Sequence, residues 1–504
     1  MTTASSSSSA SAQRALGMRF LATSLAFLLL AVVIEVVLAL EVATSSSTML
    51  PLATYQALDA ARVSTLVFLV GLPAILGGLG NLILPRTIGA AGLLWPGIGG
   101  LAYACYLGGG LLLLGGELGG NPDVAGVPVA ALGASLAGFS GFCLGVNFVL
   151  TMHFRRAPGV SLARMPVFCW SIYGVSVFNI MLAPLMGLVI TGAVLLELWE
   201  STGAAMLGIG PVLERHAAWF QSGGALYVLA VPGIGVIAEI FAVHSRRRVA
   251  GYAGIGFCSL LIAMIGSLSW LHFQLASSGS TQAIAGQAFL TLSVAVPSLV
   301  ALGACAATLH RGSIRLTTPM VFALSSFVML SFGVLAGTIP ATMGSGVHLG
   351  VTAFAEAYTN YMLVGGVALA LVAGLCHWWP AVTGNTVADS TGRLACVLAF
   401  VGFDLAFCAQ LVAGVKGLPS GANEIGGAAA ADALSGWSQL AMLGTLVGSA
   451  GLLLALAPIF QGILARTTGF ANPWGAKSRE WVADDADADP DAGPYEFAEL
   501  EDRQ

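Results

Sequence analysis

The stretch that decides the fold is Gly71-Leu72-Pro73-Ala74-Ile75-Leu76-Gly77-Gly78-Leu79-Gly80-Asn81. It carries no charge and lies inside a longer apolar run, approximately residues 61–84. A run of about 20 apolar residues is long enough for a helix to cross the hydrocarbon core of a membrane. Glycine and proline are tolerated in such helices because neighbouring helices satisfy the backbone groups that they free. We therefore expect a membrane-spanning helix here.

The same pattern recurs along the whole chain. We count twelve apolar runs, at approximately 18–41, 61–84, 93–116, 128–152, 167–195, 219–243, 253–276, 284–308, 318–341, 352–378, 391–414 and 435–464. The runs are continuous rather than alternating, and lipid requires backbone polar groups to be satisfied within the protein, so helices are favoured over strands. The sequence predicts an all-α, polytopic membrane protein with twelve transmembrane helices.

The composition indicates one membrane domain rather than a string of soluble domains. Of 504 residues, 57% are hydrophobic and 9% are charged, whereas a soluble domain carries about 25% charged residues. We assign residues 18–464 to the membrane domain. Residues 1–17 are rich in Ser and Ala and are expected to form a disordered tail. Residues 465–504, acidic at their end, are expected to form a cytoplasmic tail.

The basic residues predict the orientation of the spans. Nearly all of the 19 Lys and Arg residues fall in the two tails or in every second loop, and the exceptions are Arg62, Arg215 and Lys416. Loops rich in Lys and Arg stay on the cytoplasmic side of a membrane. We therefore expect both termini in the cytoplasm and the protein in a bacterial inner (plasma) membrane.

Further Gly, Pro and aromatic motifs follow in a fixed order. They are Arg164-Met165-Pro166, the segment 227–235 (YVLAVPGIG), the segment 307–315 (ATLHRGSIR), Thr318-Pro319-Met320, Gly417-Leu418-Pro419 and the segment 472–476 (NPWGA). Together with residues 71–81, they make the chain resemble subunit I of the heme–copper oxidases, the cytochrome c oxidase subunit I family. That resemblance implies a twelve-helix bundle, cytochrome c or quinol oxidase activity, and a site for two hemes and copper.

The heme positions implied by the resemblance carry the wrong residues. The family's low-spin heme lies between a histidine of span two and one of span ten, and these positions are Arg62 and Asn360 here. The family's high-spin heme ligand lies two residues before the latter, at Tyr358. Neither Arg nor Asn can replace a neutral imidazole on iron. A tyrosine can ligate heme, but only in a pocket that supports it.

The copper positions are degenerate as well. Where the family has His-Pro-Glu-Val-Tyr in span six, this sequence has Gly223-Gly224-Ala225-Leu226-Tyr227. The His-His pair of span seven is reduced to His272-Phe273. One imidazole of three does not make a copper site. We therefore expect no catalytic residue, no heme and no metal. His272 is expected to be a hydrogen-bonded residue inside the bundle.

Ionisable groups inside spans need a partner or a cavity. Because spans two and ten face each other in the family and Glu356 lies one turn before Asn360, we predict a buried ion pair between Arg62 and Glu356. The alternative is that Arg62 reaches the membrane surface beside Asp59. Bulky residues such as Phe273, Tyr358 and Leu226 are expected to fill the vacated heme cavities, and lipid or quinone is the alternative filling.

The remaining histidines do not assemble into a site in the sequence. His244 stands beside an arginine cluster, which predicts a solvated position at the cytoplasmic face. His377 stands near the inner end of span ten. We expect no metal centre from them.

Three functions stay open at this point. The leading hypothesis is a cofactor-less paralogue of subunit I, a pseudoenzyme that serves as a non-catalytic membrane subunit or scaffold of a respiratory or electron-transfer complex. Its partners would be membrane lipids and subunit-II-like or subunit-III-like proteins, with no nucleic acid. The first alternative is a terminal oxidase with atypical ligation, which couples oxygen reduction to proton transport. The second is a proton or small-solute transporter on the same fold.

Overall fold

The computed structural model describes residues 2–43, 50–119, 126–200, 219, 224–275, 281–342, 349–350, 352–419, 428–476 and 478–482. Twelve helical spans in these ranges are long and apolar enough to cross a membrane, which confirms the predicted number and fold class. The elements are α1 (Thr2–Ala43), α2 (Leu52–Ser64), η1 (Thr65–Gly71), η2 (Pro73–Gly80), α3 (Asn81–Thr87), α4 (Pro96–Gly119), α5 (Gly126–Phe154), η3 (Leu162–Arg164), α6 (Val167–Glu200), α8 (Gly224–Ser245), α9 (Tyr252–Leu275), α10 (Thr281–Thr308), α11 (Thr318–Thr342), α13 (Ala353–Asn360), η4 (Tyr361–Leu369), α14 (Ala370–Thr383), α15 (Asp389–Val415), α16 (Ala428–Leu464) and η6 (Arg479–Trp481).

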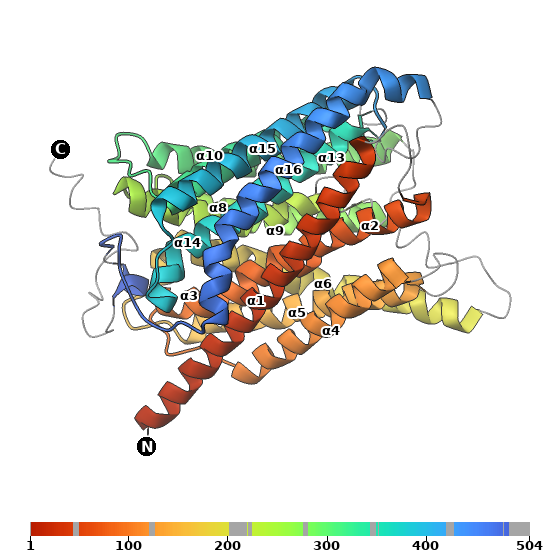
Figure 1. The fold of residues 1–504 in the computed structure, drawn as a ribbon. Coiled ribbons are helices and arrows are strands. Elements are labelled where there is room, and N and C mark those ends of the chain that lie inside the picture. The colour runs from red at the N-terminus through yellow and green to blue at the C-terminus, as the bar shows by residue number, and fades with distance from the viewer. Residues whose placement is uncertain are drawn as a thin grey trace.

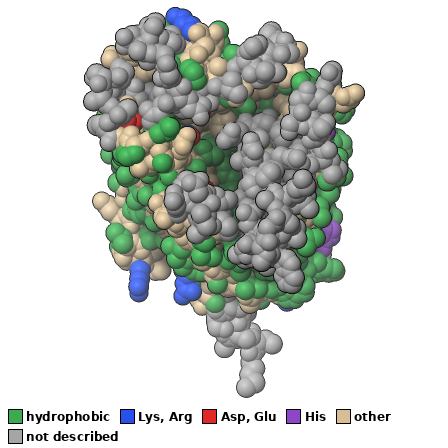
Figure 2. Space-filling view, turned by 90° about the vertical axis from the view of Figure 1, so that its right-hand side faces the viewer, with side chains coloured by type: hydrophobic (Ala, Val, Ile, Leu, Met, Phe, Trp, Pro, Cys, Tyr) green, Lys and Arg blue, Asp and Glu red, His purple; other side chains and the backbone are tan. Residues whose placement is uncertain are grey.

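The long helices of the bundle lie side by side (Figure 1), and the bundle has a buried centre and an apolar surface. Nearly all residues of α8 are buried, and so are those of the span built from α13, η4 and α14. Large apolar side chains of the outer helices are exposed instead, among them Leu188 (72% exposed) and Phe289 (69%). Figure 2 shows hydrophobic side chains over much of the described surface, with basic side chains at its upper and lower ends. Such a surface suits a lipid environment.

Helix α1 begins at Thr2, within the segment 1–17 for which the composition predicts a tail. Gln13 donates a hydrogen bond from Nε2 to the carbonyl of Asn81 and accepts one at Oε1 from the amide of Leu93, both at 2.9 Å. Arg14 donates to the carbonyl of Val382 at the end of α14. Its cation lies where the helix dipole favours positive charge.

The far end of the predicted C-terminal tail, residues 483–504, lies outside the described part of the chain. Residues 465–476 and 478–482 fold back on the bundle. Asn472 holds this segment in shape, since its Oδ1 accepts a hydrogen bond from the amide of Ala476 at 3.1 Å and its Nδ2 donates to the carbonyls of Ala476 and Trp481. The NPWGA motif is therefore a structural turn.

Small residues let α15 and α16 approach backbone to backbone. A Cβ atom at Gly402 would lie 2.1 Å from the amide nitrogen of Gly448, and one at Gly444 would lie 2.5 Å from that of Ala406. Gly444 and Gly448 are four residues apart on α16, the spacing typical of close helix pairs in membranes. This contact explains two of the glycines in the last span.

We predict that Gly402→Ala lowers the melting temperature of the purified protein. The added methyl group overlaps the backbone of α16, and overpacking of this kind costs about 1–3 kcal/mol. Gly303→Ala is the matched control, because a Cβ atom there meets nothing within 4 Å and alanine favours a helix by about 0.5–1 kcal/mol. Equal melting temperatures for the two variants would contradict the close contact.

Candidate functional site

A buried arginine lies between the second and tenth spans. Arg62 stands in the last turn of α2 and is 7% exposed, and Asn360 ends α13 and is 4% exposed. A π-helical segment follows each of the two helices directly, η1 after α2 and η4 after α13. Segments of this kind are rare and are frequent at functional sites. The two helices therefore deviate from α geometry where the resemblance placed the low-spin heme.

The side chains at these two positions contact each other directly. Arg62 donates a hydrogen bond from Nη1 to Oδ1 of Asn360 at 3.1 Å. The same Nη1 lies 3.0 Å from Oε2 of Glu35 on α1, and Nη2 lies 2.8 Å from Oδ1 of Asp59 one turn earlier on α2. One guanidinium therefore joins three of the twelve spans.

Of the two carboxylates considered for Arg62 in the sequence, Asp59 lies within ion-pair distance of it. Asp59, named in the alternative to the Arg62–Glu356 pair, forms an ion pair with the arginine, but the guanidinium is buried rather than at the surface. Glu35 was not anticipated. Glu356 lies in the wall of the same cavity as Arg62, so the ion pair between these two residues stays a prediction.

A polar cavity surrounds this cluster, with about 720 Å³ of empty space including its mouth. Its walls come from α1, α2, α13, α15 and α16. They include three carboxylates and one guanidinium, together with polar and aromatic side chains: Glu35, Asp59, Arg62, Glu356, Tyr55, Asn360, Gln410 and Trp437. Carboxylates thus outnumber cations in this wall. The rest of the wall is largely apolar and includes Leu38, Leu418 and Met442.

The residues at the two low-spin positions do not fit a heme. A guanidinium stays protonated in proteins and has no lone pair for a metal. The amide oxygen of Asn360 already accepts a hydrogen bond from Arg62, and haem iron in proteins is held by His, Cys, Met or Tyr side chains.

The high-spin position carries a buried phenol. Tyr358 is 6% exposed, and its ring centroid lies 6.3 Å from that of Phe354. Tyr227, from the degenerate copper motif, donates a hydrogen bond to the carbonyl of Val334 at 3.2 Å. Both tyrosines border Gly337, where a Cβ atom would lie 3.1 Å from the hydroxyl of Tyr227 and 3.5 Å from Cδ2 of Tyr358. The two phenols therefore occupy one packed region.

The copper positions are described only in part. Gly223 and the side chain of Phe273 lie outside the described residues. His272 packs against Gly286 of α10, where a Cβ atom would lie 2.5 Å from its Cε1 atom. Among the residues that the structure does describe, no three His, Cys, Asp or Glu side chains form a group that could hold a metal ion. The remaining imidazole and its neighbours do not fit a copper centre.

The sequence interpretation missed a pair of buried histidines. His244 is 3% exposed rather than solvated, and its Nε2 lies 3.2 Å from Nδ1 of His377. The hydroxyl of Thr317 lies 2.8 Å from the other nitrogen of His244. The ring of Trp474 covers both imidazoles, and its Nε1 donates to the carbonyl of His377. The folded-back C-terminal segment therefore excludes water from the pair, which corrects the prediction for His244.

The same segment buries an acid. Glu480 is 5% exposed and accepts a hydrogen bond from the hydroxyl of Ser478 at 3.0 Å. Burial raises the pKa of the Glu480 carboxyl above its usual value, although the hydrogen bonds oppose this shift. Its neighbour Trp481 packs edge-on to His377.

Comparison with known proteins decides the family. The family described as "Cytochrome C and Quinol oxidase polypeptide I" matches residues 15–448. The chain belongs to this family. Cytochrome c oxidase subunit 1 of Thermostichus vulcanus is 30% identical over 424 residues, covering 81% of this chain and 76% of the relative. Cytochrome c oxidase subunit 1 of Synechocystis sp. is 27% identical, covering 96% and 91%.

A third relative is the putative cytochrome c oxidase subunit 1-beta of Streptomyces coelicolor, 29% identical over 499 residues, with 93% of this chain and 84% of the relative covered. The resemblance found in the motifs is thus confirmed over nearly the whole membrane domain. The chain is a multi-pass membrane protein of this family.

We predict that Arg62→Leu destabilises the purified protein by about 1–3 kcal/mol, because it leaves Asn360 and the partly exposed carboxylates of Glu35 and Asp59 without their buried donor. Glu35 and Asp59 would lose their cation together. Arg393→Leu is the matched control, since Arg393 and its partner Asp389 are half-exposed and such a pair contributes about 0–1 kcal/mol. Thermal unfolding in one detergent checks both. A loss no larger for Arg62→Leu than for the control would contradict the role given to Arg62.

Proposed function

We propose that this chain is a cofactor-free member of its family, acting as a non-catalytic membrane subunit of a respiratory or electron-transfer complex. The observation that carries the proposal is the hydrogen bond between Arg62 and Asn360. These are the residues that stand where the resemblance places the two axial ligands of one heme.

The position of that bond supports the proposal. A heme held from these two positions would have to lie between the two side chains. The bonding atoms of Arg62 and Asn360 are 3.1 Å apart. Their contact would have to break before a porphyrin could enter.

The charges support it as well. The guanidinium of Arg62 lies within ion-pair distance of Glu35 and Asp59, so this cation has its partners within the protein. A buried cation that has lost its carboxylates would be strongly destabilising. The network thus replaces the packing that a heme would supply between α2 and α13, and this allows the bundle to persist without redox chemistry.

The role as a subunit rests on the family. The relatives are named as subunit 1 of cytochrome c oxidase, so they are parts of a larger assembly. We propose that this chain keeps that structural role in a bacterial plasma membrane, with both termini in the cytoplasm, beside subunit-II-like or subunit-III-like proteins.

The test is purification from native membranes, followed by an optical spectrum of the reduced protein, metal analysis, and mass spectrometry of what co-purifies. We expect no heme absorption bands, iron and copper far below one atom per chain, and a co-purifying membrane subunit in fixed ratio. Heme bands with stoichiometric iron would overturn the cofactor-free assignment in favour of an oxidase with atypical ligation. A chain that purifies alone would overturn the role as a subunit.

A further inference from the structure

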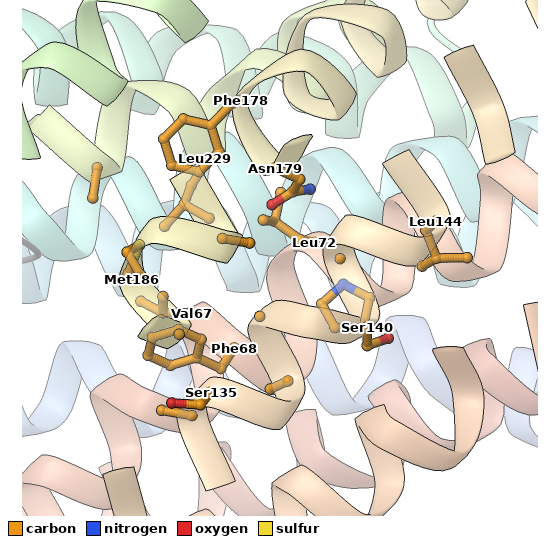
Figure 3. Close-up of a pocket in the computed structure, with 18 of the residues that line it drawn as sticks. Val67, Phe68, Leu72, Ser135, Ser140, Leu144, Phe178, Asn179, Met186 and Leu229 are labelled. Carbon is orange, nitrogen blue, oxygen red and sulfur yellow. The ribbon is translucent and has the colours of Figure 1, made fainter. Parts of the chain in front are cut away.

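A second cavity lies away from the Arg62 cluster, among η1, η2, α5, α6 and α8. It has about 850 Å³ of empty space including its opening, within the range of about 300–1,000 Å³ typical of ligand pockets. Its walls are mostly apolar and include Leu72, Leu144, Phe178, Met186 and Leu229 (Figure 3). Unlike the polar cavity, it has no charged residue among its lining residues.

One polar atom in this apolar wall lacks a partner among the described residues. Asn179 of α6 is 5% exposed, and its Nδ2 atom has no hydrogen-bond acceptor in the part of the chain that the structure describes. Figure 3 shows its amide among the side chains of Leu72, Phe178 and Leu229. A Cβ atom at Gly141 would lie 3.1 Å from Oδ1 of Asn179, so the glycine makes room for the amide. A buried donor without an acceptor is costly, which points to an acceptor supplied by a ligand.

The depth of Asn179 restricts what that ligand can be. The span Val167–Gly192 has 26 residues, and Asn179 stands near its middle, about 18 Å from its start at 1.5 Å per residue. The hydrocarbon core is about 30 Å thick, so the amide lies near the midplane of the bilayer. The ester carbonyls of phospholipids belong to the interfacial regions at the edges of that core, about 15 Å away.

The cavity can be reached from the lipid. Its lining residues Ala134 and Gly138 on α5 and Met186 on α6 are partly exposed, and their neighbours Phe139 and Leu188 are among the exposed apolar side chains of the bundle surface. A ligand dissolved in the membrane could therefore enter between α5 and α6 without crossing water.

We propose that this cavity binds a neutral, membrane-dissolved molecule with a ring carbonyl on an otherwise apolar frame, and that Asn179 donates a hydrogen bond from Nδ2 to that carbonyl. The apolar wall takes up the hydrocarbon part, and the amide selects the acceptor. The site does not depend on the Arg62 cluster, so a failure of this proposal would not affect the proposed function, and the reverse also holds. It requires no redox step.

The test titrates the full chain, in nanodiscs of one phospholipid, with two probes. One is decylubiquinone, which carries ring carbonyls, and the other is decylbenzene, which has the same alkyl chain and none. Bound probe is measured after separation from free nanodiscs. We expect wild type to prefer decylubiquinone about tenfold, because one net hydrogen bond is worth about that factor in affinity. We expect Asn179→Leu to lose this preference while it still binds decylbenzene.

A second pair of variants separates cavity binding from general partition into lipid. Leu229→Trp fills the cavity and should abolish saturable binding of both probes. Val296→Trp places the same side chain on the surface of α10, where Val296 is 58% exposed, and should leave binding unchanged. Thermal unfolding confirms that each variant folds. An unchanged probe preference in Asn179→Leu, or a phospholipid that stays in the cavity and blocks both probes, would overturn the proposal.

Discussion

The structure depends on the balance of charge around one buried guanidinium. Arg62 would be costly inside a membrane protein if it stood alone, but Glu35 and Asp59 neutralise it and Asn360 accepts a further hydrogen bond. These partners come from α1, α2 and α13, so the same contacts that satisfy the charge also join three spans. These contacts lie where the family resemblance places the low-spin heme, between the second and tenth spans.

The two cavities differ in the chemistry that they can receive. The cavity beside Arg62 contains one guanidinium and three carboxylates in a wall that is otherwise largely apolar. The cavity beside Asn179 has no charged lining residue and contains one donor without an acceptor among the described residues. Binding of a membrane-dissolved molecule in the second cavity needs a matching shape and one hydrogen bond, and it does not depend on a metal.

Much of the fold could be predicted because lipid restricts the choices of the chain. Apolar length alone predicted the spans. Composition did not reveal the contacts that Gln13 and Arg14 make with Asn81 of α3 and Val382 of α14, because these partners are far away in the sequence. The facing of Arg62 and Asn360 followed from the family resemblance. The contact between Glu35 and Arg62 could not be predicted, because one carboxylate in an apolar run does not show which neighbouring helix its side chain faces. His244 and His377 are 133 residues apart, and no local pattern connects them.

The most direct test is a cryo-electron microscopy map of the protein purified with its native partners, at a resolution that shows side chains. We predict continuous density that joins the guanidinium of Arg62 to the carboxylates of Glu35 and Asp59 and to the amide of Asn360. Flat, porphyrin-sized density between the second and tenth spans, with Arg62 turned away from Asn360, would contradict it.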